Sequence, residues 1–340
     1  MRNNKHLFGS LLLMVFSLMF AGLVCEGVLR MLGYKGAPGS LITNIRLVDD
    51  HVLNWRYIPN SVVQTGNIVN RYNSAGYRDV DHVIRRSERV KRIIVLGDSV
   101  TEGSGVQWQD IFAVRLQNAL GSQYELFNLA MSGLNTPQEV HLLEREGIAY
   151  QPDLVVLNFV LNDCDFYSAI DPEQRWAKEK DSKIGMLNFP INPEFKRFLK
   201  SSAFVYFVKE RMENLIGKAL GREEVNYFVS LWDNPENRLK VLAGLDKLER
   251  LKRDSNFRVV VMIWPLIMDF DKYEFTAIHS WILSETEKRG FFAIDLLPYF
   301  SKLHFRDLQV TAEDNVHPNA SGHHIAADAF IEWFRRESIL

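Results

Sequence analysis

From residue 91 onward, short apolar runs alternate along the chain with stretches of helical periodicity. The first run, Ile93-Ile94-Val95-Leu96, has no polar residue among its apolar ones. This is typical of a strand buried on both faces of a parallel sheet. Similar runs occupy 124–130, 153–161, 257–264 and 291–296, and helical patterns occupy 112–120, 138–149, 235–253, 273–288 and 320–337. The alternation predicts an α/β fold, a doubly wound, five-stranded parallel sheet.

Two segments depart from this alternation. Residues 27–90 are irregular, with a turn expected at 73–76, and we expect them to pack on the body. Residues 165–232 follow the third strand and contain one amphipathic helical stretch near 203–220. The sequence therefore predicts one domain over 91–340, with a helical insertion at about 165–232.

The N-terminus has a different pattern. A short basic leader, 1–6, precedes residues 7–25, which contain no charged side chain. This length suits a hydrocarbon core of roughly 30 Å. We predict a transmembrane helix over 7–26; a cleaved signal peptide and a buried core helix are the alternatives. Arg2 and Lys5 in the leader favour a single-pass protein of the inner membrane, with the body on the periplasmic side.

Composition and charge exclude several classes of function. The chain has 340 residues, 47% of them hydrophobic, with 40 Lys+Arg against 42 Asp+Glu. This balance leaves no global basic excess to attract nucleic acid, and the sequence has no basic block suited to binding it. Cys25 and Cys164 are too far apart in the predicted organisation for a disulfide to be expected. The first strand is not followed by a glycine-rich phosphate-binding motif, so we predict no nucleotide cofactor.

Polar residues with chemical potential follow the predicted strands. Ser99 comes after the first strand, Gly133 after the second and Asn162 after the third, and Asp314 and His317 precede the last helix. Gly97-Asp98-Ser99 is also ordinary turn chemistry. In an open α/β sheet, however, ligands bind beyond the carboxyl ends of the strands, where these residues would meet.

A serine hydroxyl needs a base to become nucleophilic, and histidine is the usual one. Asp314, three residues before His317, can reach the same imidazole and orient it. The backbone N–H of Gly133 and the amide of Asn162 could donate to a developing oxyanion. The pattern predicts a Ser99–His317–Asp314 triad.

This set of residues resembles the SGNH (GDSL) hydrolase family, in family order over roughly 91–338. The resemblance implies a flavodoxin-like sheet and a Ser-His-Asp esterase or acyltransferase. It also implies that Ser99, Gly133 and Asn162 supply the oxyanion donors. The uncharged N-terminal run followed by Asn-Ser-Ala-Gly-Tyr-Arg-Asp is similar to a membrane-anchored bacterial subgroup. Val160 departs from the family pattern, which usually has glycine two residues before the asparagine.

Other polar residues near these motifs have simpler interpretations. Asp98 is expected to support the serine turn, and Asp163 and Asp165 to cap or bond locally. His317, His323 and His324 could suggest a metal site, but a helix start would splay the adjacent pair, so we predict no metal. Cys164 is expected to be a small buried side chain.

Three functions stay open at this point. The first is a membrane-anchored serine esterase acting on acyl or acetyl esters of envelope glycans or lipids. The second passes the acyl group from the same acyl-enzyme to a sugar hydroxyl. The third is a non-catalytic assembly or binding subunit on the same scaffold.

Overall fold

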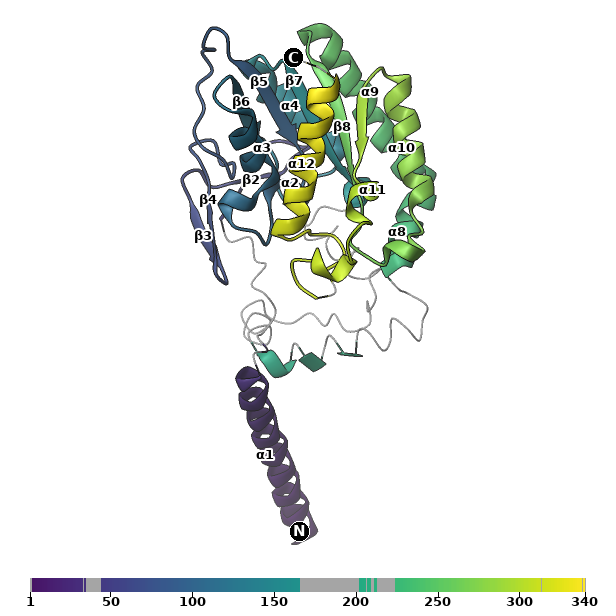
Figure 1. Cartoon of the computed structure of the whole chain (residues 1–340). Helices are drawn as coiled ribbons and strands as arrows, with labels where there is room; N and C mark the ends of the chain where they lie inside the picture. Colours follow the sequence, from purple (N-terminus) through teal and green to yellow (C-terminus); the bar gives the residue numbers. More distant parts are fainter. Residues whose placement is uncertain are drawn as a thin grey trace. The chain divides into compact units, whose positions relative to one another are not determined.

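The computed structural model describes residues 2–32, 34, 44–165, 202–205, 207–208, 211–212, 224–312, 314–337 and 339. The chain divides into two compact units. One comprises Met1–Ile42 and Trp176–Glu223, and the other comprises Thr43–Arg175 and Glu224–Leu340. The second unit contains the central sheet (Figure 1).

The central sheet has five parallel strands in the order β6-β5-β7-β8-β9. They are β5 (Lys91–Leu96), β6 (Tyr124–Asn128), β7 (Leu154–Val160), β8 (Arg258–Trp264) and β9 (Phe292–Asp295). All five predicted strands are confirmed, and the order is that of a flavodoxin-like sheet. The chain reverses direction across the sheet between β5 and β7, so a ligand crevice is expected where these two strands end.

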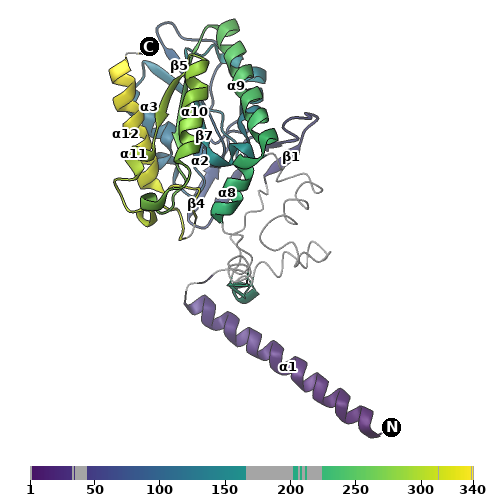
Figure 2. The same cartoon turned by 90° about the vertical axis from the view of Figure 1, so that its right-hand side faces the viewer.

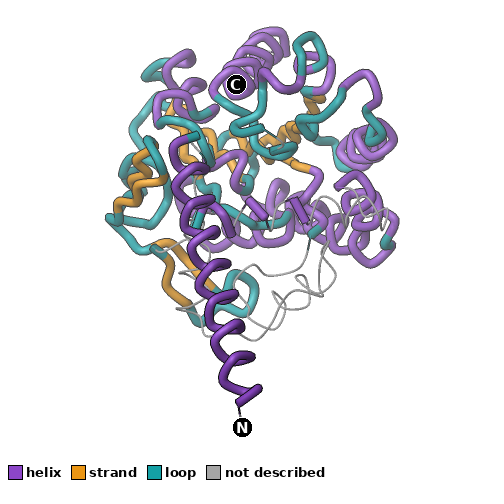
Figure 3. Tube along the Cα trace, turned by 90° about the horizontal axis from the view of Figure 1, so that it is seen from below, coloured by secondary structure: helices purple, strands orange, loops and turns teal. Residues whose placement is uncertain are grey.

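Helices cover both faces of the sheet. Helices α3 (Phe112–Leu120) and α12 (Ala320–Glu337) pack side by side on one face, while α4 (Thr136–Arg145) and α9 (Pro235–Ser255) pack together on the other. Figure 2 shows the strands between α12 and α9, and Figure 3 shows helices on both sides of the strands. Every residue of β7 is buried as a result. This explains why the strands lack the alternation of half-exposed ones.

The helices agree with the predicted periodicity. Helix α3 ends at Gly121, as expected, and Asn135 begins α4 with a capping box that includes Gln138. Helix α10 covers Thr276–Lys288. The remaining short helices of this unit are α2 (Ser99–Glu102), η1 (Trp108–Asp110), η2 (Gly147–Tyr150), η3 (Leu161–Cys164), α8 (Glu224–Asp233), η5 (Phe270–Lys272), α11 (Leu297–Phe300) and η6 (Phe305–Asp307).

The described part of the N-terminal segment, residues 44–90, contains two antiparallel strand pairs that the sequence did not predict. These are β1 (Ile45–Leu47) with β2 (Trp55–Tyr57), and β3 (Val62–Thr65) with β4 (Ile68–Arg71). The predicted turn at 73–76 is confirmed, because Gly76 N–H donates to the Asn73 carbonyl at 3.0 Å. The segment is therefore more regular than its composition indicated.

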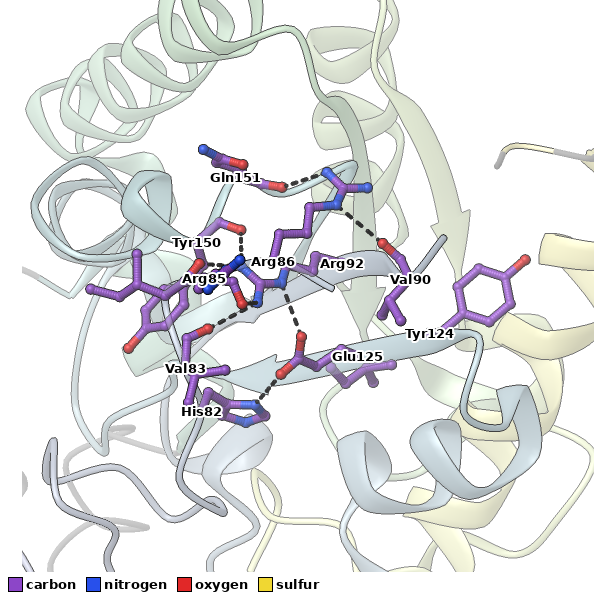
Figure 4. A network of polar contacts seen from close by, with 12 residues as sticks. His82, Val83, Arg85, Arg86, Val90, Arg92, Tyr124, Glu125, Tyr150 and Gln151 are labelled. Atoms are coloured by element: carbon purple, nitrogen blue, oxygen red, sulfur yellow. Dashed lines mark hydrogen bonds and ion pairs between the residues drawn. The ribbon is translucent and has the colours of Figure 1, made fainter. Parts of the chain in front are cut away.

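Arg92 connects this segment to the central sheet. It is fully buried near the start of β5 (Figure 4). Its guanidinium donates to the backbone carbonyls of Val83, Ile84, Arg85 and Tyr150 and to the Glu125 carboxylate at 2.9 Å. A buried guanidinium has five N–H groups that need acceptors. The irregular residues before β5 supply several of them.

The other unit contains helix α1 (Arg2–Met31), which includes the predicted transmembrane span over 7–26. Within the described residues, no helix is both long enough and apolar enough to be a candidate membrane span. The predicted transmembrane helix is therefore not supported. Glu26 on α1 accepts hydrogen bonds from Ser202 Oγ (2.7 Å) and from the N–H groups of Ala203 and Phe204. These bonds, with the Phe204 N–H first among them, lower the pKa of Glu26 to about 2.

The predicted helical insertion at 165–232 is covered only in part. Residues 166–201 lie outside the described residues, as does most of the predicted amphipathic stretch near 203–220. Helix α8, at the end of the insertion, belongs to the unit that contains the central sheet.

Candidate active site

The turn after β5 places Ser99 at the first position of α2. Asp98 is the N-cap of this helix, and its Oδ1 accepts a bond from Val100 N–H at 2.9 Å. Gly97 allows the helix to pack against the strand end. A Cβ on Gly97 would lie only 2.1 Å from Thr101 Oγ1 and 3.2 Å from Asn158 Cβ. The Gly-Asp-Ser sequence thus combines a close approach, a helix cap and an emerging hydroxyl.

Ser99, His317 and Asp314 form a continuous chain of hydrogen-bond contacts. Ser99 Oγ lies 2.9 Å from His317 Nε2. The other ring nitrogen, Nδ1, lies 3.1 and 3.0 Å from the two carboxylate oxygens of Asp314. Asp314 Oδ1 also accepts a bond from the His317 backbone N–H at 2.9 Å, which fixes the loop. When Nδ1 donates to Asp314, Nε2 is free to accept the serine proton.

The charges around His317 favour its protonated form. Burial alone would lower the pKa of His317, but the hydrogen bond and charge of Asp314 outweigh it and raise the pKa above its ordinary value. The charges of Asp98 and Glu102 act in the same direction. Burial would raise the pKa of Asp314, but its bonds with His317 lower it overall. His317 is therefore a stronger base than a free histidine.

Asn162 lies beside the serine turn, as predicted. It is in η3, directly after β7, and its Nδ2 donates to Asp98 Oδ2 at 2.8 Å. Asp98 Oδ2 in turn lies 3.4 Å from Ser99 Oγ. One carboxylate thus contacts both the expected nucleophile and the expected oxyanion donor. Asp98 supports the serine turn, as predicted, and in addition it contacts Ser99 and Asn162.

Gly133 lies in the loop between β6 and α4, with φ +75, and no described atom lies within 4 Å of the position that a Cβ would occupy. A positive φ of this size favours glycine. Two contacts bring this loop to the serine turn. Met131 N–H donates to the Gly97 carbonyl at 3.2 Å, and Ser132 N–H donates to Glu102 Oε2 at 2.8 Å. The structure therefore brings all five predicted site residues to the edge of the sheet at the carboxyl ends of the strands.

A pair of buried carboxyls, Glu139 and Asp163, lies next to this site, and only Asp163 was singled out in the sequence. Glu139 on α4 and Asp163 in η3 are both buried, and burial together with nearby carboxylate charge raises the pKa of each well above its usual range. Asp163 has the predicted local bond, with the Val160 backbone, and it also accepts a bond from Thr136 Oγ1 at 3.1 Å, a partner distant in sequence. Asp165 likewise accepts a bond from the hydroxyl of the distant Tyr227, at 2.6 Å.

The other residues singled out in the sequence have structural environments. His323 is buried and its Nδ1 accepts a bond from Phe112 N–H; burial lowers its pKa to about 3. His324 pairs with Asp110 at 3.1 Å. Across the described ranges, no three His, Cys, Asp or Glu side chains group as metal ligands would. Cys164 is fully buried, as expected.

Val160, the departure from the family pattern, is fully buried at the end of β7. It belongs to the apolar core between the sheet and helices α3 and α12, together with Phe112 and Trp264. The Asn162 amide still reaches Asp98 beside Ser99. The valine side chain therefore contributes to the core.

A family model described as GDSL-like Lipase/Acylhydrolase matches residues 95–325. No curated protein matches the chain. Among solved structures, TesA is 12% identical, with a TM-score of 0.45 over 74% of this chain and 100% of its own.

Two further solved structures are similar at the same level. A member of the lipolytic protein G-D-S-L family from Veillonella parvula is 15% identical, with a TM-score of 0.43 over 73% of this chain and 100% of its own. An acetylxylan esterase from Geobacillus stearothermophilus is 17% identical, with a TM-score of 0.42 over 71% of this chain and 93% of its own. The family model covers more than half of the chain, and the residues that it matches include the serine turn and the Asp314–His317 loop.

Proposed function

Since the chain belongs to the GDSL-like lipase/acylhydrolase family, we propose that it hydrolyses acyl esters through an acyl-enzyme on Ser99. In this proposal His317 is the general base and acid, and Asp314 orients it. The observation that carries the proposal is the contact chain from Ser99 Oγ through His317 to Asp314, at 2.9 and 3.0 Å.

In the first half of the reaction, Ser99 Oγ bonds to the ester carbonyl carbon while its proton passes to His317 Nε2. The carbonyl oxygen becomes an oxyanion, which the N–H groups of Ser99 and Gly133 and the second amide hydrogen of Asn162 would stabilise. Collapse of the tetrahedral intermediate breaks the ester C–O bond. The departing oxygen takes the proton from Nε2 and leaves as an alcohol.

In the second half, a water molecule replaces the alcohol. His317 removes a proton from this water as its oxygen bonds to the acyl carbon, and the bond to Ser99 Oγ then breaks. Ser99 recovers its proton from Nε2 and the carboxylic acid leaves. The raised pKa of His317 makes it a stronger base, but a larger fraction is protonated and inactive near neutral pH.

We further propose acyl or acetyl esters of glycans or lipids as the substrate class. Transfer of the acyl group to a sugar hydroxyl would use the same acyl-enzyme, but none of the contacts among the described residues favours it over hydrolysis. The periplasmic location stays a prediction from the basic leader.

The test is covalent labelling by a fluorophosphonate probe, which requires an activated serine. Wild type should be labelled and should hydrolyse a short-chain aryl ester, whereas Ser99→Ala and His317→Ala should do neither. Ser280→Ala is the matched control, because Ser280 is exposed on α10 and its hydroxyl donates to the Thr276 carbonyl of its own helix. Wild type that is never labelled between pH 6 and 9 would instead support the non-catalytic alternative.

A further inference from the structure

Glu102 is a buried acidic residue at the end of α2, one turn after Ser99, with 4% of its surface exposed. Its carboxylate accepts four hydrogen bonds. Oε1 accepts one from the Tyr72 hydroxyl at 2.8 Å. Oε2 accepts three, from the Tyr57 hydroxyl (2.8 Å), Ser132 N–H (2.8 Å) and Ser132 Oγ (2.6 Å). Hydrogen bonds to a carboxylate are stronger than those between neutral groups, so these bonds hold the Glu102 side chain in one position.

Glu102 and its partner Ser132 lie next to the two expected backbone donors of the oxyanion hole. Ser132 directly precedes Gly133, whose N–H is an expected oxyanion donor, and both bonds from Ser132 go to one oxygen of Glu102. Glu102 belongs to the same helical turn as Ser99, the other backbone donor. One carboxylate therefore connects the two loops whose N–H groups must point at the same oxygen. Loss of an oxyanion donor costs roughly 10²–10³ in kcat, so their relative placement matters.

The N-terminal segment, residues 44–90, completes the environment of Glu102. Tyr57 and Tyr72 both come from it, and their rings are in contact at 4.3 Å between centroids. Burial, reinforced by the Glu102 charge, raises the pKa of both hydroxyls, so they stay protonated and donate. Arg78 adds bonds to the carbonyls of Gly103 (2.5 Å) and Val106 (2.8 Å), which follow α2.

We propose that Glu102 is a positioning residue that sets the geometry of the oxyanion hole, and that Tyr57 and Tyr72 make the N-terminal segment a part of it. Glu102 does not touch the reacting atoms; it acts through Ser132 on the Gly133 N–H. The inference rests on the proposed function, since it concerns the same acyl-enzyme reaction.

The first experiment compares Glu102→Gln, Tyr57→Phe and Tyr77→Phe in the full chain. Tyr77→Phe is the matched control, because Tyr77 is also buried in the N-terminal segment and donates to a carboxylate, Glu146 at 2.7 Å. We expect Glu102→Gln and Tyr57→Phe to lower kcat on a short-chain aryl ester by about 10-fold or more, with KM changed by less than about twofold. Tyr77→Phe should retain wild-type kcat even if its Tm falls.

Two further measurements separate positioning from general loss of structure. Affinity for an alkylboronic acid, whose tetrahedral adduct carries an oxygen into the oxyanion hole, should weaken in proportion to the loss in kcat/KM. The pH profile should distinguish the variants as well. Among Asp314, Asp98 and Glu102, which all raise the pKa of His317, only the Glu102 charge is removed by Glu102→Gln. Its acid limb should move to lower pH, whereas that of Tyr57→Phe should not.

The inference would be overturned if Glu102→Gln kept the kcat and the boronate affinity of a wild-type protein that is itself labelled and active. The proposed function would still stand in that case. Equal losses of kcat in Tyr57→Phe and Tyr77→Phe would also overturn the inference, because both would then report only on the packing of the segment. Absence of labelling in the wild type would instead remove the proposed function itself.

Discussion

The protonation state of Glu139, a buried glutamate close to the active site, can be tested directly through the stability of the protein. Glu139 is 1% exposed on α4, and within the described part of the chain neither of its carboxyl oxygens has a hydrogen-bond partner. Burial first, then the charges of Asp163 and Asp98, raise its pKa well above the usual range. Glu139 is therefore protonated in the folded protein at a pH where the unfolded chain has lost that proton. We expect Glu139→Gln, which replaces one neutral polar group by another, to change how stability depends on pH.

The size of the effect follows from proton linkage. The effect develops over a pH range that begins at the pKa of a glutamate in the unfolded chain, about 4.3, and ends at the raised pKa of Glu139 in the folded protein. Within this range the folded state holds one proton more than the unfolded state, so the free energy of unfolding falls as pH rises, by about 1.4 kcal/mol per pH unit for one group. Glu139→Gln removes this contribution. Relative to wild type, the variant should therefore gain stability progressively as pH rises through this range.

The assay is urea unfolding at several pH values, followed by tryptophan fluorescence, since Trp232 and Trp264 are buried in the same unit. Glu144→Gln is the control. Glu144 lies on the same helix but is exposed and pairs with Lys247 at 2.5 Å. Its stability curve should run parallel to that of wild type. If the Glu139→Gln curve also runs parallel, Glu139 is ionised in the folded protein and the reasoning fails.

Three other substitutions test the site. Asn162→Ala should lower kcat on a short-chain aryl ester by roughly 10²–10³. Unchanged turnover would mean that the Asn162 amide does not face the oxyanion. Asp314→Asn should reduce kcat by up to about 10⁴ and move the acid limb of kcat/KM to lower pH, since the carboxylate raises the pKa of His317. An acid limb at the wild-type pH would contradict this. Gly97→Ala should cost about 1–3 kcal/mol in urea unfolding, because its Cβ would overlap Thr101; wild-type stability would contradict the packing argument.

The sheet and the triad could be predicted because their signals are local in sequence. Continuous apolar runs such as Ile93–Leu96 mark strands buried on both faces, and the ends of parallel strands meet at one edge. Ser99, Asn162 and His317 could therefore be placed together from their positions after strands and before the last helix. Gly133 could be placed with them from its position after the second strand, and the family pattern agreed with this placement.

The features that the sequence did not predict depend on contacts between residues that are distant in sequence. Glu139 occurs in the helical stretch "EVHLLERE" as an ordinary glutamate, and only the packing of α4 on the sheet shows that it is buried. Glu102 likewise has no local signal, since its partners Tyr57, Tyr72 and Ser132 are 30 or more residues away in sequence. The strands between 45 and 71 are three or four residues long, too short for a visible alternation.

The bonds of the N-terminal segment also bear on the order in which the protein folds during synthesis. Arg56 and Tyr77 both bond to Glu146, and Tyr57 and Tyr72 bond to Glu102. Every one of these partners is synthesised later than the segment itself. The segment leaves the ribosome before these partners and cannot complete its hydrogen bonds until β5, β6 and α4 have followed. Its buried tyrosines and arginines must therefore stay hydrated until the strands assemble, so this segment is made before the sheet and docks after it.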